Sequence, residues 1–289
     1  MRNFLSITDL GREELFELLE IAATQKRRVC SQILLNQHIA LIFEKPSLRT
    51  KASFEVGIQE LSGTTSFFGP NECGILDERE SVEDFSRVIS SYYDAVVARV
   101  YNHVALEKFA VSSSVPVINA LSDREHPCQV LADLLTIRER LGRIENFKLA
   151  FLGDGNNVAL SLALAAEILN FKFILAGSKK YFLPFPQIDQ TENLSAALNN
   201  ADVIYTDTWN SMGAEDSAAE RNLALRPYQL NAVALREASP KAIVMHCLPA
   251  HRDDEITEEV LNSPKSVVFQ QAANRLPAQK ALFIKLFEY

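Results

Sequence analysis

The sequence predicts an α/β protein built from two doubly wound parallel-sheet domains. Short apolar segments alternate with helical patterns, and the alternation occurs twice along the 289 residues. A chain of this length is enough for about two domains of ordinary size. Strands that alternate with amphipathic helices form βαβ units, in which the sheet is parallel and helices cover both of its faces.

The first half begins with a helix, marked by Leu15, Leu18, Leu19 and Ala22 at helical spacing. Four short apolar segments then predict buried strands, and helical patterns separate them. The predicted strands are 39–43, 64–68, 94–99 and 115–119. The predicted helices are 48–61, 81–92, 103–112 and 123–142, the last of which ends at Gly142.

The second half repeats the pattern, with strands near 148–152, 171–176, 202–205 and 242–246 and helices between them. The domain boundary is placed within the long helix, which gives domains of residues 1–135 and 136–289. A last helix, at about 272–287 with its start near Asn274-Arg275, is expected to return to the first domain and pack against it.

The composition excludes several classes of protein. The net charge is −8, whereas a nucleic-acid partner requires a broad basic surface. No apolar run approaches the ~20 residues that cross a bilayer, and the N-terminus has no apolar core of the signal-peptide type. The four cysteines lack paired or metal-type spacing, which is typical of reduced thiols. We therefore expect a cytoplasmic protein with no nucleic-acid or membrane partner.

Ligands of open α/β sheets bind beyond the carboxyl ends of the strands, so the residues that follow each strand are the first candidates. After the strand at 39–43, a helix begins with Ser47, Arg49, Thr50 and Lys51. A helix start offers unpaired N–H groups and a positive dipole end, which suit an anion. A simple helix cap explains Ser47 alone, so the hydroxyl–cation cluster favours a phosphate site.

Two further strand ends of the first half carry polar residues. Arg99 ends an apolar strand, where it serves either an ion pair or a ligand. His126 and Gln129 follow the strand at 115–119 and share one face of a helix start. A single histidine is more often structural, but its place at a third successive strand end favours a function.

The strand at 148–152 leads into Gly-Asp-Gly-Asn-Asn, at 153–157. This resembles a dinucleotide-binding turn, but the third glycine is missing and no acidic residue ends the next strand. A nicotinamide-dependent dehydrogenase is therefore disfavoured. Two consecutive amides at a helix start instead suit a ligand with amino and carboxylate groups.

Asp207 and Cys247 follow the next two strands. A thiolate nucleophile usually has a histidine partner, but His246 adjoins Cys247 in an extended segment, where neighbouring side chains point to opposite faces. Lining of the pocket is therefore favoured over covalent catalysis for Cys247.

Together these residues resemble the ornithine carbamoyltransferases, within the aspartate/ornithine transcarbamylase family. Ser47-Leu48-Arg49-Thr50-Lys51 is similar to the family's carbamoyl-phosphate motif, and His-Pro-Cys-Gln at 126–129 is similar to its second motif. The Asp207–Gly213 loop with Ser-Met-Gly and His-Cys-Leu-Pro at 246–249 are similar to the motifs for ornithine. The likeness covers nearly the whole chain.

The resemblance implies that residues 1–135 bind carbamoyl phosphate and residues 136–289 bind ornithine, with the active site between the domains. The residues it assigns to carbamoyl phosphate are Ser47, Leu48, Arg49, Thr50, Arg99, His126, Gln129, Cys247, Leu248 and Arg275. Those it assigns to ornithine are Asn157, Asp207, Ser211 and Met212. It places Arg99, His126, Thr50 and Cys247 at the reacting groups, and it also places Cys247 and Leu248 around the ornithine side-chain amine.

The implied reaction transfers the carbamoyl group to the δ-amine of L-ornithine and gives L-citrulline and phosphate, with no metal or organic cofactor. The family also implies a homotrimer, or a multiple of trimers, in arginine metabolism. Three alternatives stay open: transfer to a related amine such as putrescine or an N-acylated ornithine, a non-catalytic binding protein of the same fold, and the disfavoured dehydrogenase.

Overall fold

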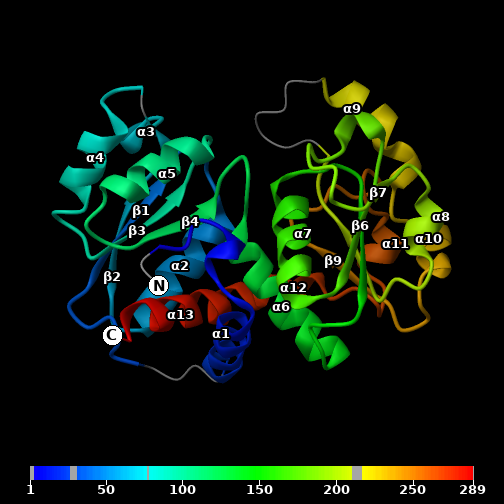
Figure 1. Ribbon diagram of the computed structural model, residues 1–289, viewed down its shortest axis with the longest axis horizontal. Helices are drawn as coiled ribbons and strands as arrows, with labels where there is room; N and C mark the ends of the chain where they lie inside the picture. Colours follow the sequence, from blue (N-terminus) through cyan, green and yellow to red (C-terminus); the bar gives the residue numbers. More distant parts are fainter. Residues whose placement is uncertain (1–2, 27–30, 77, 210–216, 289) are drawn as a thin grey trace. The chain divides into compact units, whose positions relative to one another are not determined.

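The computed structural model describes residues 3–26, 31–76, 78–209 and 217–288. Its contacts divide the chain into two compact units (Figure 1). The first unit comprises residues 1–135 and 274–289, and the second comprises 136–273. None of the described helices combines the length and the apolarity that crossing a lipid bilayer requires.

The first unit contains a four-stranded parallel sheet in the order β2-β1-β3-β4. Its strands are β1 (His38–Phe43), β2 (Thr64–Phe68), β3 (Ala95–Arg99) and β4 (Val117–Leu121). Its helices are α1 (Arg12–Gln25), α2 (Leu48–Glu60), α3 (Pro70–Cys73), α4 (Val82–Ile89), α5 (His103–Ser112) and α13 (Arg275–Phe287). The short helix η1 (Ile7–Asp9) precedes α1.

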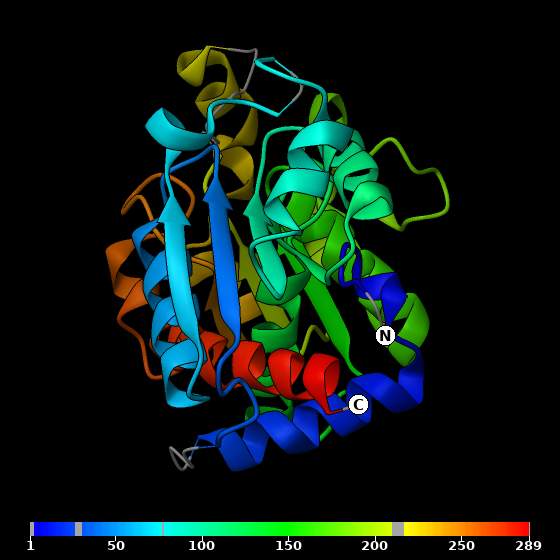
Figure 2. The same ribbon diagram turned by 90° about the vertical axis from the view of Figure 1, so that its left-hand side faces the viewer.

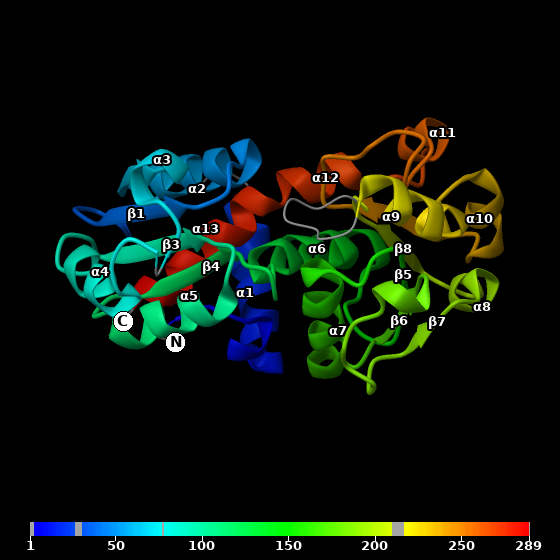
Figure 3. The ribbon, with the colours of Figure 1, turned by 90° about the horizontal axis from the view of Figure 1, so that it is seen from above.

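Helices cover both faces of this sheet, as the sequence predicts (Figure 3). On one face, Ala40 and Val96 of the strands pack with Phe109 of α5 and Val82 of α4. On the other side, α13 packs against α1 and α2, and the rings of Phe54 and Phe283 meet edge to face. Figure 2 shows α13 lying beside α1. The predicted return of the last helix to the first half of the chain is confirmed.

The second unit contains a five-stranded parallel sheet in the order β7-β6-β5-β8-β9. Its strands are β5 (Lys148–Leu152), β6 (Lys172–Ala176), β7 (Gln190–Thr191), β8 (Val203–Thr206) and β9 (Ile243–His246). Its helices are α7 (Asn157–Leu169), α8 (Leu194–Leu198), α9 (Ala218–Leu225), α10 (Ala232–Glu237), α11 (Glu258–Leu261) and α12 (Val268–Ala273). The short helices η2 (Lys179–Tyr181) and η3 (Arg226–Tyr228) lie between them.

The core of the second unit also lies on both faces of its sheet. Alternate residues such as Leu152 and Ile204 pack with α8, α10 and α11, which lie on the far side of the sheet from α7 (Figure 1). The opposite face carries the stacked rings of Phe151 and Tyr205. The period of two that marks a strand therefore separates two layers of core on either side of the sheet.

One predicted helix start is wrong by several residues. The helix predicted at 123–142 is α6 (Pro127–Leu141), because the residue before a proline is disfavoured in helical conformation and Pro127 is suited to the first helical position. The start predicted near Asn274-Arg275 for the last helix is confirmed: α13 begins at Arg275, and a separate helix, α12, ends at Ala273. Pro277 has no N–H to donate to the carbonyl group of Ala273, so one continuous helix would lack a hydrogen bond there.

Candidate active site

The first-unit candidates follow β1 and β3, the neighbouring strands at which the strand order of the sheet reverses. Such a reversal is the usual place for a ligand in an open α/β sheet. The start of α2 follows β1, and Arg99 is the last residue of β3. The register pairs Phe43 with Arg99, so the ends of these two strands are level.

The start of α2 is held by a chain of hydroxyl groups. Ser47 caps the helix: its Oγ accepts from the backbone N–H of Thr50 at 3.3 Å and donates to the Thr50 hydroxyl at 2.9 Å. Thr50 Oγ1 also accepts from Nη2 of Arg275 at 2.8 Å. Residues 225 positions apart in the sequence therefore meet at one oxygen atom.

Arg275 joins two elements of the first unit. Its guanidinium is buried and donates through Nη1 to Gln129 Oε1 at 2.9 Å, while Nη2 reaches Thr50. The Gln129 amide is oriented in turn, because its Nε2 donates to Asp133 at 2.9 Å. A planar, permanently charged fork fixed in this way is the geometry that recognises phosphate and carboxylate oxygens.

His126 is buried beside these cations. Burial, and then the positive charges of Arg275 and Arg99, hold the pKa of His126 well below its usual range. The imidazole is therefore neutral at physiological pH and retains one N–H donor. A neutral ring adds a hydrogen bond to an uncharged carbonyl group without adding charge to an already cationic place.

Lys45 and Glu44 also lie at the carboxyl end of β1, near Arg99 and Tyr101, but they were not among the residues predicted from the sequence. Lys45 is buried, and its pKa is lowered by burial and then by the nearby charge of Arg99. Its ammonium lies 4.2 Å from the centre of the Tyr101 ring. Glu44 accepts from the backbone N–H groups of Tyr101 and Leu76, each at 2.5 Å, and burial raises its pKa. The position of both residues directly after an apolar strand was a signal that could have found them.

The other cations of the first motif lie at the surface. Arg49 and Leu48 are exposed, and Leu48 is the first residue of α2. Lys51 is half-buried, with its ammonium 3.8 Å from the centre of the Phe67 ring and 3.8 Å from a carboxylate oxygen of Glu55. Lys51 is thus held by its own unit, whereas Arg49 presents its charge to solvent.

The second-unit candidates follow β5, β8 and β9, and the strand order reverses between β5 and β8. Asp207 is buried, and its Oδ2 accepts from Nδ2 of Asn156 at 2.7 Å. Asn156 caps α7 with its Oδ1, which accepts from Val158 and Ala159 at 3.0 Å each. Asn157, the predicted residue, is the half-buried first residue of α7. Asn156 is a further candidate that the sequence pairs with it.

Cys247 is joined to Asp207 by a contact of 2.8 Å from Sγ to Oδ1. Asp207, His246 and Cys247 each offer one metal-ligand atom, and these atoms lie within 4.8 Å of one another. The thiol contacts the carboxylate of Asp207. In His246, Nε2 lies 3.0 Å from Oε1 of Glu255, and Nδ1 lies 2.8 Å from the backbone nitrogen of Leu248. The group is therefore a hydrogen-bonded set of residues, and the predicted thiol lies among them.

Of the three remaining candidates, the structure describes Leu248 but not Ser211 or Met212. Leu248 follows Cys247 with φ of 57°, a left-handed conformation that is uncommon for leucine. Ser211 and Met212 lie outside the described residues, which omit 210–216.

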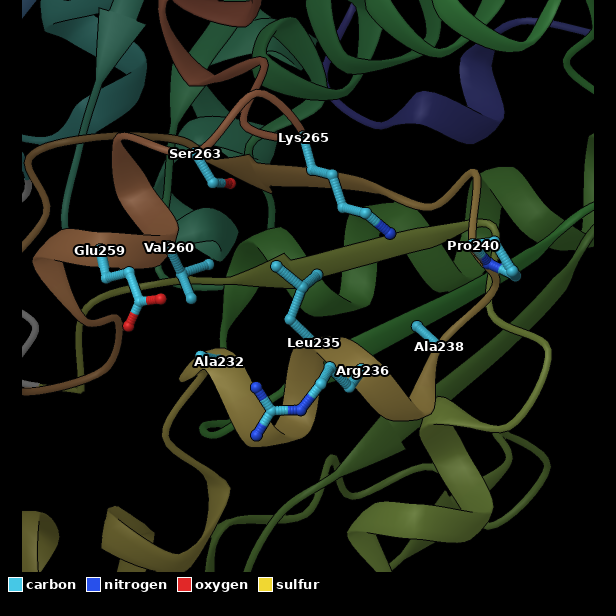
Figure 4. Close-up of a pocket in the computed structure, with 9 residues that line it drawn as sticks. All are labelled: Ala232, Leu235, Arg236, Ala238, Pro240, Glu259, Val260, Ser263 and Lys265. Atoms are coloured by element: carbon cyan, nitrogen blue, oxygen red, sulfur yellow. The ribbon is translucent and has the colours of Figure 1, made fainter.

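A separate groove of about 410 Å³ opens in the second unit (Figure 4). It is lined by α10, α11 and the segments that follow them, with Arg236, Glu259 and Lys265 among apolar residues. None of the candidate residues that the structure describes lines this groove. The candidate site is therefore defined by the polar side chains at the strand ends and not by this groove.

The fold and the strand-end residues define a two-unit α/β protein with cations and hydroxyl groups at the strand ends of one unit and carboxylate, amide and thiol groups at those of the other. The chain belongs to the aspartate/ornithine carbamoyltransferase family. The model of the family's carbamoyl-phosphate-binding domain matches residues 2–139, and that of its aspartate/ornithine-binding domain matches residues 145–286.

Similar proteins carry the name ornithine carbamoyltransferase. That of Methanoculleus marisnigri is 44% identical over 299 residues, which cover 99% of this chain and 96% of that protein. That of Archaeoglobus fulgidus is 44% identical over 301 residues, covering 99% and 97%. The solved structure of the Pyrococcus furiosus enzyme has a TM-score of 0.94 at 40% identity, covering 99% and 97% of the two chains. The anabolic enzyme of Campylobacter jejuni has a TM-score of 0.93 at 37% identity, covering 99% of each.

Proposed function

We propose that this chain is an ornithine carbamoyltransferase, which transfers the carbamoyl group of carbamoyl phosphate to the δ-amine of L-ornithine. The observation that carries the proposal is the buried Arg275 guanidinium, which spans the hydroxyl of Thr50 and the amide of Gln129 and, like Arg99, lies near His126. Similarity to ornithine carbamoyltransferases over 99% of the chain supports it.

The first unit, with residues 1–135, is proposed to bind carbamoyl phosphate. Burial, and then the nearby charge of Arg99, lower the pKa of Lys45, so a bound phosphate would compensate both the lost hydration and the repulsion between the cations. The residues proposed to hold the phosphate are Ser47, Leu48, Arg49, Thr50, Arg99 and Arg275. His126 and Gln129 are proposed to hold the carbamoyl group, His126 as a neutral hydrogen-bond donor.

The second unit is proposed to bind ornithine. Asp207 is a carboxylate that suits an ammonium group. Asn157, at the start of α7, adjoins Asn156, which donates to Asp207. Ser211 and Met212 complete the proposed contacts to the α-amino and α-carboxylate groups. Cys247 and Leu248 are proposed to line the space around the side-chain amine.

The proposed reaction is a direct displacement. The neutral δ-amine donates its lone pair to the carbamoyl carbon, and a C–N bond forms while the carbonyl electrons move to oxygen. Arg99, His126 and Thr50 stabilise that oxygen, a contribution of about 3 kcal/mol per donor. The C–O bond to phosphate then breaks, and phosphate leaves with the proton that the amine loses. Positioning of the two substrates supplies most of the remaining rate.

A panel of amines tests this function. With carbamoyl phosphate, L-ornithine is expected to give citrulline and phosphate, and kcat/KM for putrescine or N-acetylornithine is expected to be at least about 100-fold lower. The reason is that Asp207 loses a charged partner when the α-amino group is absent or acylated. A colorimetric assay for the ureido product measures all three. Faster reaction of putrescine or N-acetylornithine would reassign the substrate, and tight binding of carbamoyl phosphate without any product would favour a non-catalytic protein.

The assembly and setting of the enzyme are also proposed, on the basis of the family resemblance. The chain is proposed to form a homotrimer and to act in arginine biosynthesis in the cytoplasm, where Cys73, Cys128 and Cys247 remain reduced as they are in this structure. Light scattering is expected to give three times the 32.3 kDa mass of one chain, or a multiple of that value. A mass of one chain at micromolar concentration would contradict the trimer.

A further inference from the structure

Glu255 is a buried carboxylate of the second unit that the proposed reaction does not use. Its side chain is 1% exposed. Oε1 lies 3.0 Å from Nε2 of His246 and accepts from the backbone N–H of His251 at 2.6 Å, and Oε2 lies 3.7 Å from Nδ1 of His251. Burial of a carboxylate is costly unless its hydrogen bonds are made, so this arrangement selects a defined position for each partner.

The contacts of His246 fix its tautomer. The ring is fully buried, and its Nδ1 lies 2.8 Å from the backbone N–H of Leu248. A backbone N–H can only donate, so Nδ1 is the acceptor and the ring proton is on Nε2, where it points at Glu255. Glu255 accepts the hydrogen bond of that proton and so favours the tautomer in which Nδ1 is free to accept from Leu248.

Nδ1 of His246 accepts from a residue, Leu248, whose backbone conformation is unusual. Leu248 has φ of 57°, in the left-handed region that non-glycine residues seldom occupy. Such a conformation persists where neighbouring contacts determine it. The bond from the N–H of Leu248 to His246 is such a contact, and it lies directly beside Cys247.

A second path leads from Glu255 to the other side of the same site. Besides its contacts to Glu255, His251 lies with Nδ1 3.0 Å from the hydroxyl of Thr208. The backbone N–H of Thr208 donates to Oδ1 of Asp207 at 2.8 Å, and the same oxygen accepts from Cys247. One buried carboxylate is therefore connected both to the segment of Asp207 and to the segment of Cys247 and Leu248.

We propose that Glu255 is a positioning residue for the amine end of the ornithine site: it fixes the His246 tautomer that sets the backbone of Leu248, and it orients His251 toward Thr208 and Asp207. The inference rests on the proposed function for the identity of the ligand. The contacts it invokes belong to the second unit. The groups of the first unit that are proposed to hold the phosphate are therefore expected to be unaffected, whereas the carbamoyl end, to which the resemblance also assigns Cys247 and Leu248, is expected to change with the ornithine site.

Two variants at Glu255 distinguish the effect of its hydrogen-bond acceptors from the effect of its negative charge. In Glu255→Gln, the amide oxygen still accepts the two N–H groups. In Glu255→Leu, both acceptors are lost at similar volume. The KM for ornithine is expected to rise about 10-fold or more in the leucine variant, the size of effect seen when a buried hydrogen-bond partner is lost, and to stay within about 3-fold in the glutamine variant. The Kd for inorganic phosphate, which tests the phosphate groups of the first unit, is measured by calorimetry and is expected to stay within 2-fold in both.

The matched control is Glu259→Leu, the same substitution at an exposed glutamate of α11; it is expected to leave all constants unchanged. Long-range ¹H–¹⁵N NMR of the imidazoles reads the tautomer directly and does not depend on any activity. His246 is expected to show a proton on Nε2 in the wild type and in Glu255→Gln, and a mixture of tautomers in Glu255→Leu. If Glu255→Leu does not fold, Glu255→Asp, which keeps the charge but shortens the reach, is expected to show the same two changes.

An unchanged tautomer or an unchanged KM for ornithine in Glu255→Leu would overturn the inference, as would a loss in Glu255→Gln as large as that in Glu255→Leu. These outcomes are distinct from failure of the proposed function. A wild-type protein that makes no citrulline would refute the proposed function. The NMR measurement would still show whether Glu255 fixes the tautomer of His246.

Discussion

Replacement of Arg275 by methionine is expected to lower kcat/KM by about 10³ or more and to raise the pKa of His126. The fork of Arg275 donates to Thr50 at 2.8 Å and to Gln129 at 2.9 Å, so the substitution removes a fixed cation and leaves buried acceptors behind. Loss of one preorganised donor at a transition state costs about 10²–10³ in rate. Loss of a cation with two placed donors is expected to cost more.

The His126 titration gives a second readout that does not depend on turnover. Burial and the charges of Arg275 and Arg99 lower the pKa of His126 in the folded protein, while the unfolded value is near 6.5. The unfolded state therefore binds more protons below about pH 6.5, and this group lowers the stability of the fold as the pH falls through that range. Its contribution is fully favourable above the unfolded pKa. In Arg275→Met one cause of the lowered pKa is removed, so NMR is expected to show titration at a higher pH than in the wild type.

Arg275→Lys is the matched control, because it keeps the charge and loses the fork. It is expected to keep the low pKa of His126 while losing much of the affinity for carbamoyl phosphate. A methionine variant that retains wild-type kcat/KM would remove Arg275 from the site. A methionine variant with an unchanged His126 titration would show that burial alone sets the pKa of that ring.

Replacement of Arg221 by methionine is expected to lower the free energy of unfolding by about 3–5 kcal/mol, the usual cost of leaving one partner of a buried ion pair alone. The Arg221 guanidinium pairs with Asp154, and both side chains are 11% exposed. Its Nε donates to the carbonyl oxygen of Trp209 at 2.8 Å, and the group lies 4.5 Å from the centre of the Tyr181 ring. These contacts connect the turn after β5 to the turn after β8.

Trp209 makes this prediction straightforward to measure, because it is the only tryptophan of the chain and it is buried in the second unit. Its fluorescence during urea unfolding reports on that unit alone. The control is the double variant Asp154→Asn with Arg221→Met, which removes both charges and is expected to recover part of the loss. A single variant within 1 kcal/mol of the wild type, or a double variant less stable than the single one, would contradict the ion-pair explanation.

The strands and helices of the two parallel sheets could be predicted from the sequence, because the patterns that indicate them lie within short segments of the chain. The strand at 148–152 matches β5, and the helix at 103–112 matches α5, since each is bounded by residues that end a regular pattern. The strand predicted at 115–119 is β4 at 117–121. Pro116 precedes it, and a β-bulge between Ala98 and Arg99 shifts the register, which hydrophobic periodicity does not reveal.

The site was only partly predictable, because its geometry depends on contacts between distant residues. The search at strand ends found Thr50, Gln129 and Asp207, because each comes shortly after a strand. Lys45 was overlooked although it also comes shortly after β1. Glu255 does not follow a strand directly, and its role depends on its contacts with His246 and His251. The pairing of Arg275 with Thr50 was accessible only through resemblance, since no local pattern joins residues 225 positions apart.

The return of α13 to the first unit has a consequence for synthesis on the ribosome. Residues 1–135 emerge first, but Arg275 and the helix that packs against α1 and α2 emerge last. The nascent first unit therefore exposes an uncovered apolar face and lacks a cation of its anion site until the whole second unit has been translated. A truncated transcript yields no half-protein with a complete anion site, and a circular permutant that begins at residue 274 would make this unit from one continuous stretch of chain.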